Sequence, residues 1–356
     1  MSVKSQLRKR IQAASILLLI VVAVLAGCGT IRTYYASLEM HDEDNPARNS
    51  RPLKDRYAIE IAQRFGLMAL FSTVAYRNDL DDLRESHGIE SDCNYKDNWG
   101  FGMPQVEGNG RWMRLQSIPA TSVLDTSVGC LDDRKRGLFY ETYVYRSGDG
   151  MFEEAVIVYR GTENVSGQLL SDWSANLSAF LGFEPEQYKI ARQNLPKIID
   201  TLKRLNQGKH GAREVQIFVT GHSLGGGLAQ QAGYLSPDVL EVFTFNTSPV
   251  TNWSSLRLDH QIANNYPVIF RLYHIGEALD PVRTFTTATT SSRFGRYDIG
   301  VQIEPKSRFY GHAVQIFTCE FANRLVSNGD RLADHHYPES YARMDVLRDT
   351  RICSER

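Results

Sequence analysis

A serine flanked by glycines stands in the middle of the chain, in the run Gly221-His222-Ser223-Leu224-Gly225-Gly226-Gly227. Residues 215–220 before it are mostly apolar, and residues 224–235 after it favour a helix. Glycines two residues on either side of a serine remove side chains that would collide with the backbone at a sharp strand-to-helix turn. The N-terminus of the following helix offers N–H groups and a positive dipole to an oxyanion. The pattern predicts that Ser223 is the nucleophile of an acyl-transfer reaction.

A nucleophilic serine needs a base, and the base needs an acid that orients it. In hydrolases with this turn, the chain order is serine, acid, histidine. The carboxylates that follow the predicted strand 268–273 are Glu277, Asp280 and Asp298. Each of these three is a candidate for the acid.

Among the histidines, His312 follows a glycine in a predicted loop, which suits a side chain that must reach over the sheet edge to the serine. His274 precedes the candidate acids and is therefore in the wrong order. His222 is expected to pack beneath the serine, whereas His335 and His336 lie in a polar tail. We expect His312 to be the base, and this chemistry requires no metal or organic cofactor.

Strands and helices alternate around these residues. Two alternating runs, 139–145 and 155–159, are separated by the turn-forming residues 147–150 and predict a β-hairpin. A helix over 184–206 contains Pro196, which is expected to kink or split it. The remaining predictions are helices over 57–76, 224–235 and 313–326 and strands over 215–220, 239–245 and 268–273. This order indicates an α/β domain with a mostly parallel sheet.

Four motifs in order resemble the class 3, fungal-type lipases of the α/β-hydrolase fold. Besides the serine turn, they are Arg160-Gly161-Thr162, Asp172-Trp173 and the Phe245-Asn246 segment with Pro249, which has one more residue before the proline than the family pattern. The resemblance covers roughly residues 135–320. It implies an α/β-hydrolase fold and a carboxylic ester hydrolase.

The resemblance also implies roles for particular residues. Thr162 and the N–H of Leu224 would form the oxyanion hole. Asp280, in Asp280-Pro281-Val282, is similar to the family's acid and is our first choice, with Glu277 next; a turn carboxylate before Pro281 is the alternative. His312 matches the family's histidine before the last helix. Residues 163–183 correspond to the family's lid, although their apolar side chains could equally belong to a short packed helix.

The N-terminus has the pattern of a targeting signal. Four basic residues and no acidic ones are followed by an apolar run and by Leu25-Ala26-Gly27-Cys28. This run resembles the lipobox of bacterial lipoproteins, so we expect residues 1–27 to be a signal peptide and Cys28 to carry lipid. Gly29 after the cysteine favours the outer membrane over the inner one. The expected location is therefore the bacterial cell envelope, on a membrane face that the sequence leaves open.

The other four cysteines would meet an oxidising compartment. They are Cys93, Cys130, Cys319 and Cys353, and they allow three pairings, of which Cys93–Cys130 with Cys319–Cys353 is the most local in sequence. Free buried thiols are the alternative. Their spacing is not that of a structural zinc site.

Charge and length limit the remaining possibilities. Beyond the signal, 36 basic residues stand against 41 acidic ones, without a basic stripe, so nucleic acid is not an expected partner. Residues 28–55 are polar and are expected to form a tether, followed by one catalytic domain over 56–356 in which 78–133 is irregular. The prediction is a lipase or phospholipase. One alternative is an enzyme with the same three residues, namely a small-ester esterase, a thioesterase or an acyltransferase. The other is a lipoprotein that binds an envelope component on an inactive hydrolase scaffold.

Overall fold

The structure is a computed structural model of the chain. It describes residues 32–37, 55–76, 93, 112–118, 128–161, 184–250, 252, 256, 267–277, 279, 296–303 and 311–327. In chain order its elements are β1 (Arg32–Ser37), α2 (Asp55–Val74), β2 (Trp112–Arg114), the 3₁₀ turn η3 (Leu115–Ser117), β3 (Cys130–Asp133), β4 (Leu138–Arg146), β5 (Phe152–Arg160), α6 (Glu186–Arg204), β6 (Gln216–His222), α7 (Leu224–Leu235), β7 (Val239–Phe245), β8 (Val268–His274), β9 (Arg296–Gln302) and α11 (Gln315–Ser327).

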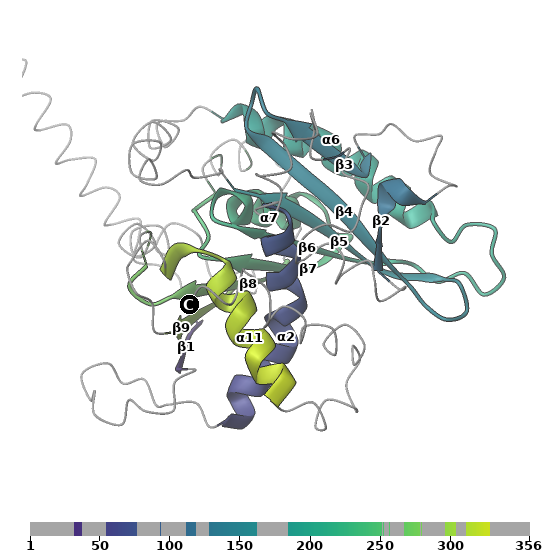
Figure 1. Cartoon of the computed structure of the whole chain (residues 1–356). Coiled ribbons are helices and arrows are strands. Elements are labelled where there is room, and N and C mark those ends of the chain that lie inside the picture. The colour runs from purple at the N-terminus through teal and green to yellow at the C-terminus, as the bar shows by residue number, and fades with distance from the viewer. Residues whose placement is uncertain are drawn as a thin grey trace, which may run out of the picture.

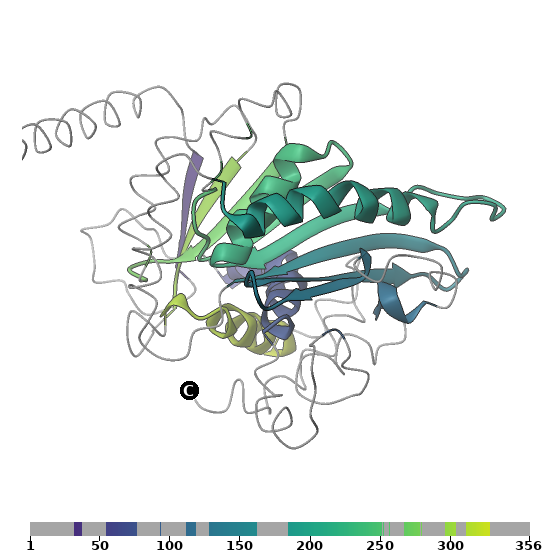
Figure 2. The same cartoon turned by 90° about the horizontal axis from the view of Figure 1, so that it is seen from above.

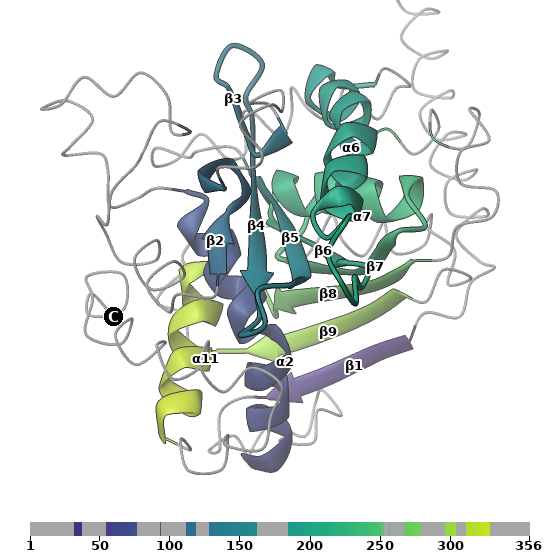
Figure 3. The same cartoon turned by 90° about the vertical axis from the view of Figure 1, so that its right-hand side faces the viewer.

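A nine-stranded sheet runs through these residues, with the strand order β1-β9-β8-β7-β6-β5-β4-β2 and β3 paired to β4 (Figure 3). Strands β5 to β9 are parallel and lie in their order along the chain, and β1 adds a further parallel strand beside β9. Strand β4 is antiparallel to β5, β2 and β3. The six parallel strands β1 and β5–β9 therefore form one continuous block, and the antiparallel strands lie at its β5 end.

Helices cover both faces of the sheet (Figures 1 and 2). Helices α6 and α7 connect successive parallel strands that progress in one direction, and right-handed crossovers place such helices on the same face. Helices α2 and α11 pack side by side on the opposite face. Successive side chains of β5 point to opposite faces of the sheet. Val156 and Val158 join the core between the sheet and the helices α2 and α11. Ala155 and Ile157 join the core between the sheet and the helices α6 and α7.

Most of the expected helices and strands are confirmed, and the mostly parallel sheet with flanking helices is that of an α/β-hydrolase. Three expectations differ from the structure. Helix α6 continues through Pro196 as one helix. Residues 32–37, within the expected tether, form strand β1, which pairs with β9 from Arg32↔Tyr297 to Ser37↔Gln302. Part of the expected irregular region 78–133 is also ordered, since it contributes β2, η3 and β3.

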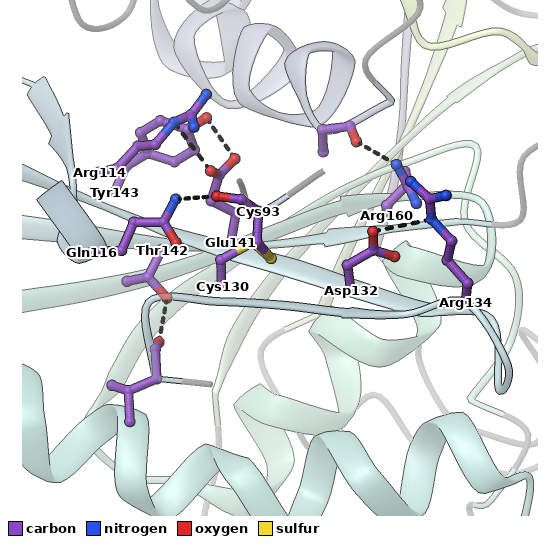
Figure 4. The surroundings of a disulfide bond; sticks show 12 residues. Cys93, Arg114, Gln116, Cys130, Asp132, Arg134, Glu141, Thr142, Tyr143 and Arg160 are labelled. Carbon is purple, nitrogen blue, oxygen red and sulfur yellow. Dashed lines mark hydrogen bonds and ion pairs between the residues drawn. A yellow bond between two sulfur atoms is a disulfide. The ribbon is translucent and has the colours of Figure 1, made fainter. Parts of the chain in front are cut away.

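A disulfide joins Cys93 to Cys130 at the start of β3, with Cα atoms 5.7 Å apart (Figure 4). The Cys93 carbonyl accepts a hydrogen bond of 2.9 Å from the Gln116 side chain. Cys319 in α11 is also disulfide-bonded, and its partner lies outside the described residues. The local pairing Cys93–Cys130 is thus confirmed.

The expected signal peptide, Cys28, the lid region 163–183 and Cys353 lie outside the described residues. In the part of the chain that the structure describes, no helix is long and apolar enough to cross a membrane.

Candidate active site

The turn between β6 and α7 places Ser223 in a strained conformation. Its φ is 55° and its ψ is −125°, which non-glycine residues rarely adopt. Such strain costs on the order of 1–3 kcal/mol and persists only where surrounding contacts hold it. Here the Ser223 N–H donates to the Phe245 carbonyl at 3.1 Å, and the Ser223 carbonyl accepts from the Ser248 N–H at 3.0 Å. The end of β7 and the segment after it therefore hold the serine in place.

Glycines let the turn pack tightly against its neighbours. A Cβ on Gly221 would overlap the Gly225 carbonyl, and a Cβ on Gly225 would overlap the Tyr159 carbonyl in β5. A Cβ on Gly226 would overlap the side chain of Thr247. These contacts explain the glycine spacing seen in the sequence, because α7 can begin this close to the sheet only where side chains are absent.

Ser223, His312 and Glu277 form one hydrogen-bonded chain. The Ser223 Oγ lies 3.1 Å from His312 Nε2, and His312 Nδ1 lies 2.7 Å from Glu277 Oε2. A carboxylate only accepts hydrogen bonds, so Nδ1 carries the proton and Nε2 is left to accept from the serine hydroxyl. The side chain of Glu277 is buried, and its Oε2 also accepts from the Leu279 N–H at 2.8 Å. This geometry is that of a nucleophile, a base and an orienting acid.

The position expected for Asp280 is thus occupied by Glu277, the second choice of the sequence analysis, while Asp280 itself lies outside the described residues. The physical reason is the turn that follows β8. The Glu277 N–H donates to the His274 carbonyl at 3.3 Å, and Gly276 has a φ of 81°, as the third residue of a type II turn requires. This tight turn brings Glu277 back toward His312 immediately after the strand ends.

The end of β5 lies directly beside the serine. A Cβ on Gly161 would lie 3.2 Å from the Ser223 Cβ and 2.8 Å from the His222 carbonyl. Thr162, the next residue, lies outside the described residues. Leu224 is the first residue of α7, where backbone N–H groups have no partner within the helix. Gly161 and Leu224 therefore flank Ser223 from two elements.

Asn246 is a site residue that sequence analysis did not assign. It has a φ of 42°, and its Nδ2 donates to the carbonyls of Gly311 and His312, each at 2.9 Å. Its Oδ1 accepts from the His274 N–H at 2.8 Å. The Asn246 side chain thus ties the end of β8 to the helical turn of Gly311 and His312. The available signal was its place in the Phe-Asn motif, because asparagine tolerates positive φ better than most residues.

His222 is buried beneath the serine, as expected from the sequence. Its Nδ1 lies 2.6 Å from the Tyr76 hydroxyl, and its Nε2 lies 2.6 Å from the His312 carbonyl. Burial, followed by the nearby His312, lowers the pKa of His222 well below its usual range. His222 is therefore neutral at pH 7.

No cluster of histidine, cysteine or carboxylate side chains suited to a metal occurs among the described residues.

Comparison with known proteins gives one family. Residues 110–266, which include β4 to β7 and the serine turn, match the family model "Phospholipase-like: Tle-like phospholipase domain". A comparison with curated proteins gives no significant match. The matched segment contains Ser223, whereas Glu277 and His312 lie beyond it.

Solved structures with some similarity include three esterases or lipases. The extracellular lipase LipA of Serratia marcescens is 17% identical, with 64% of this chain and 41% of that one covered and a TM-score of 0.32. Esterase B of Lactobacillus rhamnosis, inhibited by a tributyrin phosphonate, is 11% identical, with 59% and 82% covered and a TM-score of 0.29. Acetyl xylan esterase 1 of Thermoanaerobacterium is 12% identical, with 51% and 79% covered and a TM-score of 0.25.

The fold assignment rests on the strand order and on the strained serine turn, and the assignment of activity rests on the family match. Together they support a lipolytic carboxylic ester hydrolase with an α/β-hydrolase fold.

Proposed function

We propose that the protein is a serine hydrolase that cleaves carboxylic ester bonds of phospholipids or acylglycerols through a covalent acyl-serine. The observation that carries this proposal is the hydrogen-bonded chain from Ser223 through His312 to the buried Glu277, at a strained turn between a strand and a helix. Three groups so arranged are what activation of a serine hydroxyl requires.

In the proposed mechanism, His312 Nε2 takes the hydroxyl proton as Ser223 Oγ attacks the ester carbonyl. The resulting tetrahedral intermediate collapses when the same proton passes to the leaving alcohol, and the acyl group stays on Ser223. Water then attacks the acyl-serine and gives a proton to His312. His312 passes this proton to Ser223 Oγ as the second tetrahedral intermediate collapses, which releases the fatty acid and the free serine. Glu277 holds the ring in the required tautomer and stabilises the imidazolium that forms twice per cycle.

For the oxyanion, we propose the N–H of Leu224 and the Thr162 residue that follows Gly161. The support is the position of Leu224 at the N-terminus of α7 and the closeness of Gly161 to Ser223. Helix N-termini favour negative charge, and donors aimed at an oxyanion each contribute about 3 kcal/mol to transition-state stabilisation.

The proposed substrate class rests on the family match, whose name specifies a phospholipase-like domain. The resemblance of four motifs to class 3 lipases supports lipid esters too, and membership of that subfamily is part of the proposal. We also propose that residues 1–27 are removed, that Cys28 carries lipid and that the enzyme acts at the outer membrane. Lipid at Cys28 would keep the active site near its substrate.

The test is hydrolysis by the purified full chain of soluble esters of increasing acyl length, triacylglycerol emulsions and phosphatidylglycerol or phosphatidylethanolamine vesicles. We expect cleavage of the lipid esters, and we expect Ser223→Ala to lose both this activity and labelling by a fluorophosphonate probe. A Ser223→Ala protein that still cleaves esters would refute the assignment. Cleavage of short soluble esters alone would refute the lipid part and leave the serine mechanism standing.

A further inference from the structure

Tyr76 reaches the active site from an element that the motifs do not include. It follows the C-terminal end of α2, and its N–H donates to the Thr73 carbonyl at 3.1 Å. Its hydroxyl lies 2.6 Å from His222 Nδ1, and the two rings meet edge to face with centroids 5.5 Å apart. This contact joins residues 146 positions apart in the sequence.

The hydrogen-bond partners fix the direction of this contact. The His312 carbonyl can only accept, so His222 Nε2 carries the hydrogen and donates to it at 2.6 Å. The neutral ring then has a lone pair on Nδ1, and the Tyr76 hydroxyl donates to that nitrogen. Tyr76 therefore selects the tautomer in which His222 can hold the His312 backbone.

The His312 carbonyl thus receives two donors, His222 Nε2 and Asn246 Nδ2. The His222 and His312 rings also lie against each other, with centroids 4.9 Å apart. The backbone of His312 is thus held by two donors, while its side chain lies between Ser223 Oγ and Glu277 Oε2. A shift of this backbone would lengthen both catalytic hydrogen bonds.

The same end of α2 touches the end of β5. A Cβ on Gly161 would lie 2.7 Å from the Tyr76 hydroxyl, and Arg160 donates to the Ala75 carbonyl at 3.3 Å. Helix α2 itself is tied to the fold by buried hydroxyl pairs, Ser72 with Thr220 at 3.0 Å and Thr73 with Thr318 at 2.7 Å. The hydroxyl of Tyr76 is therefore supported by a helix with fixed position.

We propose that Tyr76 and His222 are positioning residues that hold the backbone of His312 in its catalytic place. This inference rests on the proposed serine hydrolase function. It adds an element, α2, that lies outside the family match at residues 110–266. Neither residue touches the reacting atoms.

The test compares four variants of the full chain, Tyr76→Phe, His222→Leu, His222→Gln and Thr73→Val. Active sites are counted by fluorophosphonate labelling carried to completion, and kcat and KM are measured with a soluble short-chain ester. We expect kcat per labelled site to fall on the order of tenfold in His222→Leu and less in Tyr76→Phe, with KM nearly unchanged, because misplacement of a base slows chemistry more than binding. Thr73→Val removes one of the two hydroxyl pairs that fix the same helix but leaves the contact with His222 in place, so it is expected to lower thermal stability and to lower kcat per labelled site less than Tyr76→Phe does.

Comparison of His222→Gln with His222→Leu separates a positioning role of His222 from a role in packing alone. The amide nitrogen of glutamine can replace Nε2 as the donor, so His222→Gln should recover most of the kcat that His222→Leu loses. Full kcat per labelled site in both Tyr76→Phe and His222→Leu would overturn the proposal and leave these residues a structural role. If His222→Leu does not fold, kcat per labelled site of Tyr76→Phe decides the question, because this variant loses only the hydroxyl oxygen and is expected to fold. A parent chain that is not labelled at Ser223 would instead refute the proposed function, and this inference with it.

Discussion

At the scale of single residues, the site depends on short contacts between parts of the chain that are distant in sequence. Ser223 follows β6, Glu277 follows β8, and His312 precedes α11. His312 makes two hydrogen bonds through its side chain, to Ser223 and Glu277, and its carbonyl accepts two more, from His222 and Asn246. Its position is therefore held both by a buried carboxylate and through its own backbone.

The acid is the residue on which the sequence and the structure differ, and a matched pair of variants tests it. We expect Glu277→Gln to lower kcat by about 10⁴-fold, because an amide in the acid's place favours the wrong tautomer of the histidine. Asp280→Asn is expected to change kcat little. Steady-state kinetics on a soluble ester, normalised to active sites, measures both. The reverse ranking would restore Asp280 as the acid.

The pairing of Ser223 with His312 could be predicted from sequence, because the glycine spacing around Ser223 and the position of His312 shortly before the last predicted helix are local signals. The carboxylate that contacts His312 could not, because Glu277 and Asp280 both follow β8 within a few residues and only the fold of the turn at Gly276 decides between them. Nothing in the sequence around Tyr76 indicated that this residue reaches the site. Its contact with His222 exists only once α2 packs on the sheet.

At the scale of elements, alternation in the sequence predicted the two strands of the hairpin, β4 and β5, which run through the core. Strand β9 was missed because its sequence contains two charged residues, Arg296 and Asp298, and a glycine. Asp298 is nonetheless buried, and it pairs at 3.2 Å with Arg271 on the neighbouring strand β8. A buried ion pair across two strands cannot be recognised from either strand alone.

The antiparallel end of the sheet carries the Cys93–Cys130 disulfide and, close to it, the buried pair Arg114–Glu141, whose acid also accepts from the Tyr143 hydroxyl at 2.8 Å (Figure 4). Strand β3 pairs with β4, and β5 separates β4 from β6, the strand that precedes Ser223. The disulfide therefore fixes this edge without touching the site.

A double variant, Cys93→Ala with Cys130→Ala, tests that separation. The bond closes a loop with a sequence separation of 37, so its loss is expected to lower stability by about 4 kcal/mol. The kcat per active site at 25 °C should stay near that of the parent. Thermal or denaturant unfolding and active-site-normalised kinetics measure the two effects. A large loss of kcat with unchanged stability would contradict the expectation.

At the scale of the whole molecule, the α/β-hydrolase domain begins earlier than sequence analysis expected. Strand β1 starts at Arg32, four residues beyond the Cys28 that we propose carries lipid. Four residues span at most about 14 Å when extended. A lipid at Cys28 would therefore hold the catalytic domain close to the membrane surface rather than on a long tether.

Lipid attachment at Cys28 is tested by a change at that residue. We expect Cys28→Ser, expressed with its signal in a bacterial host, to lose incorporation of radiolabelled palmitate and to leave the membrane fraction. Activity on soluble esters should be retained, because the site is built from residues far along the chain. Continued membrane association without palmitate would instead indicate an uncleaved signal as the anchor.

The pairing of β1 with β9 also sets an order of events during synthesis. Strand β1 ends at Ser37, and its partner begins at Arg296, so the first strand to be made pairs with the last strand of the sheet. Pairing between such distant segments is slow because a long loop must close first. Strand β1 must therefore stay unpaired until the residues up to β9 have been produced. A nascent chain that stops short of β9 cannot complete this edge.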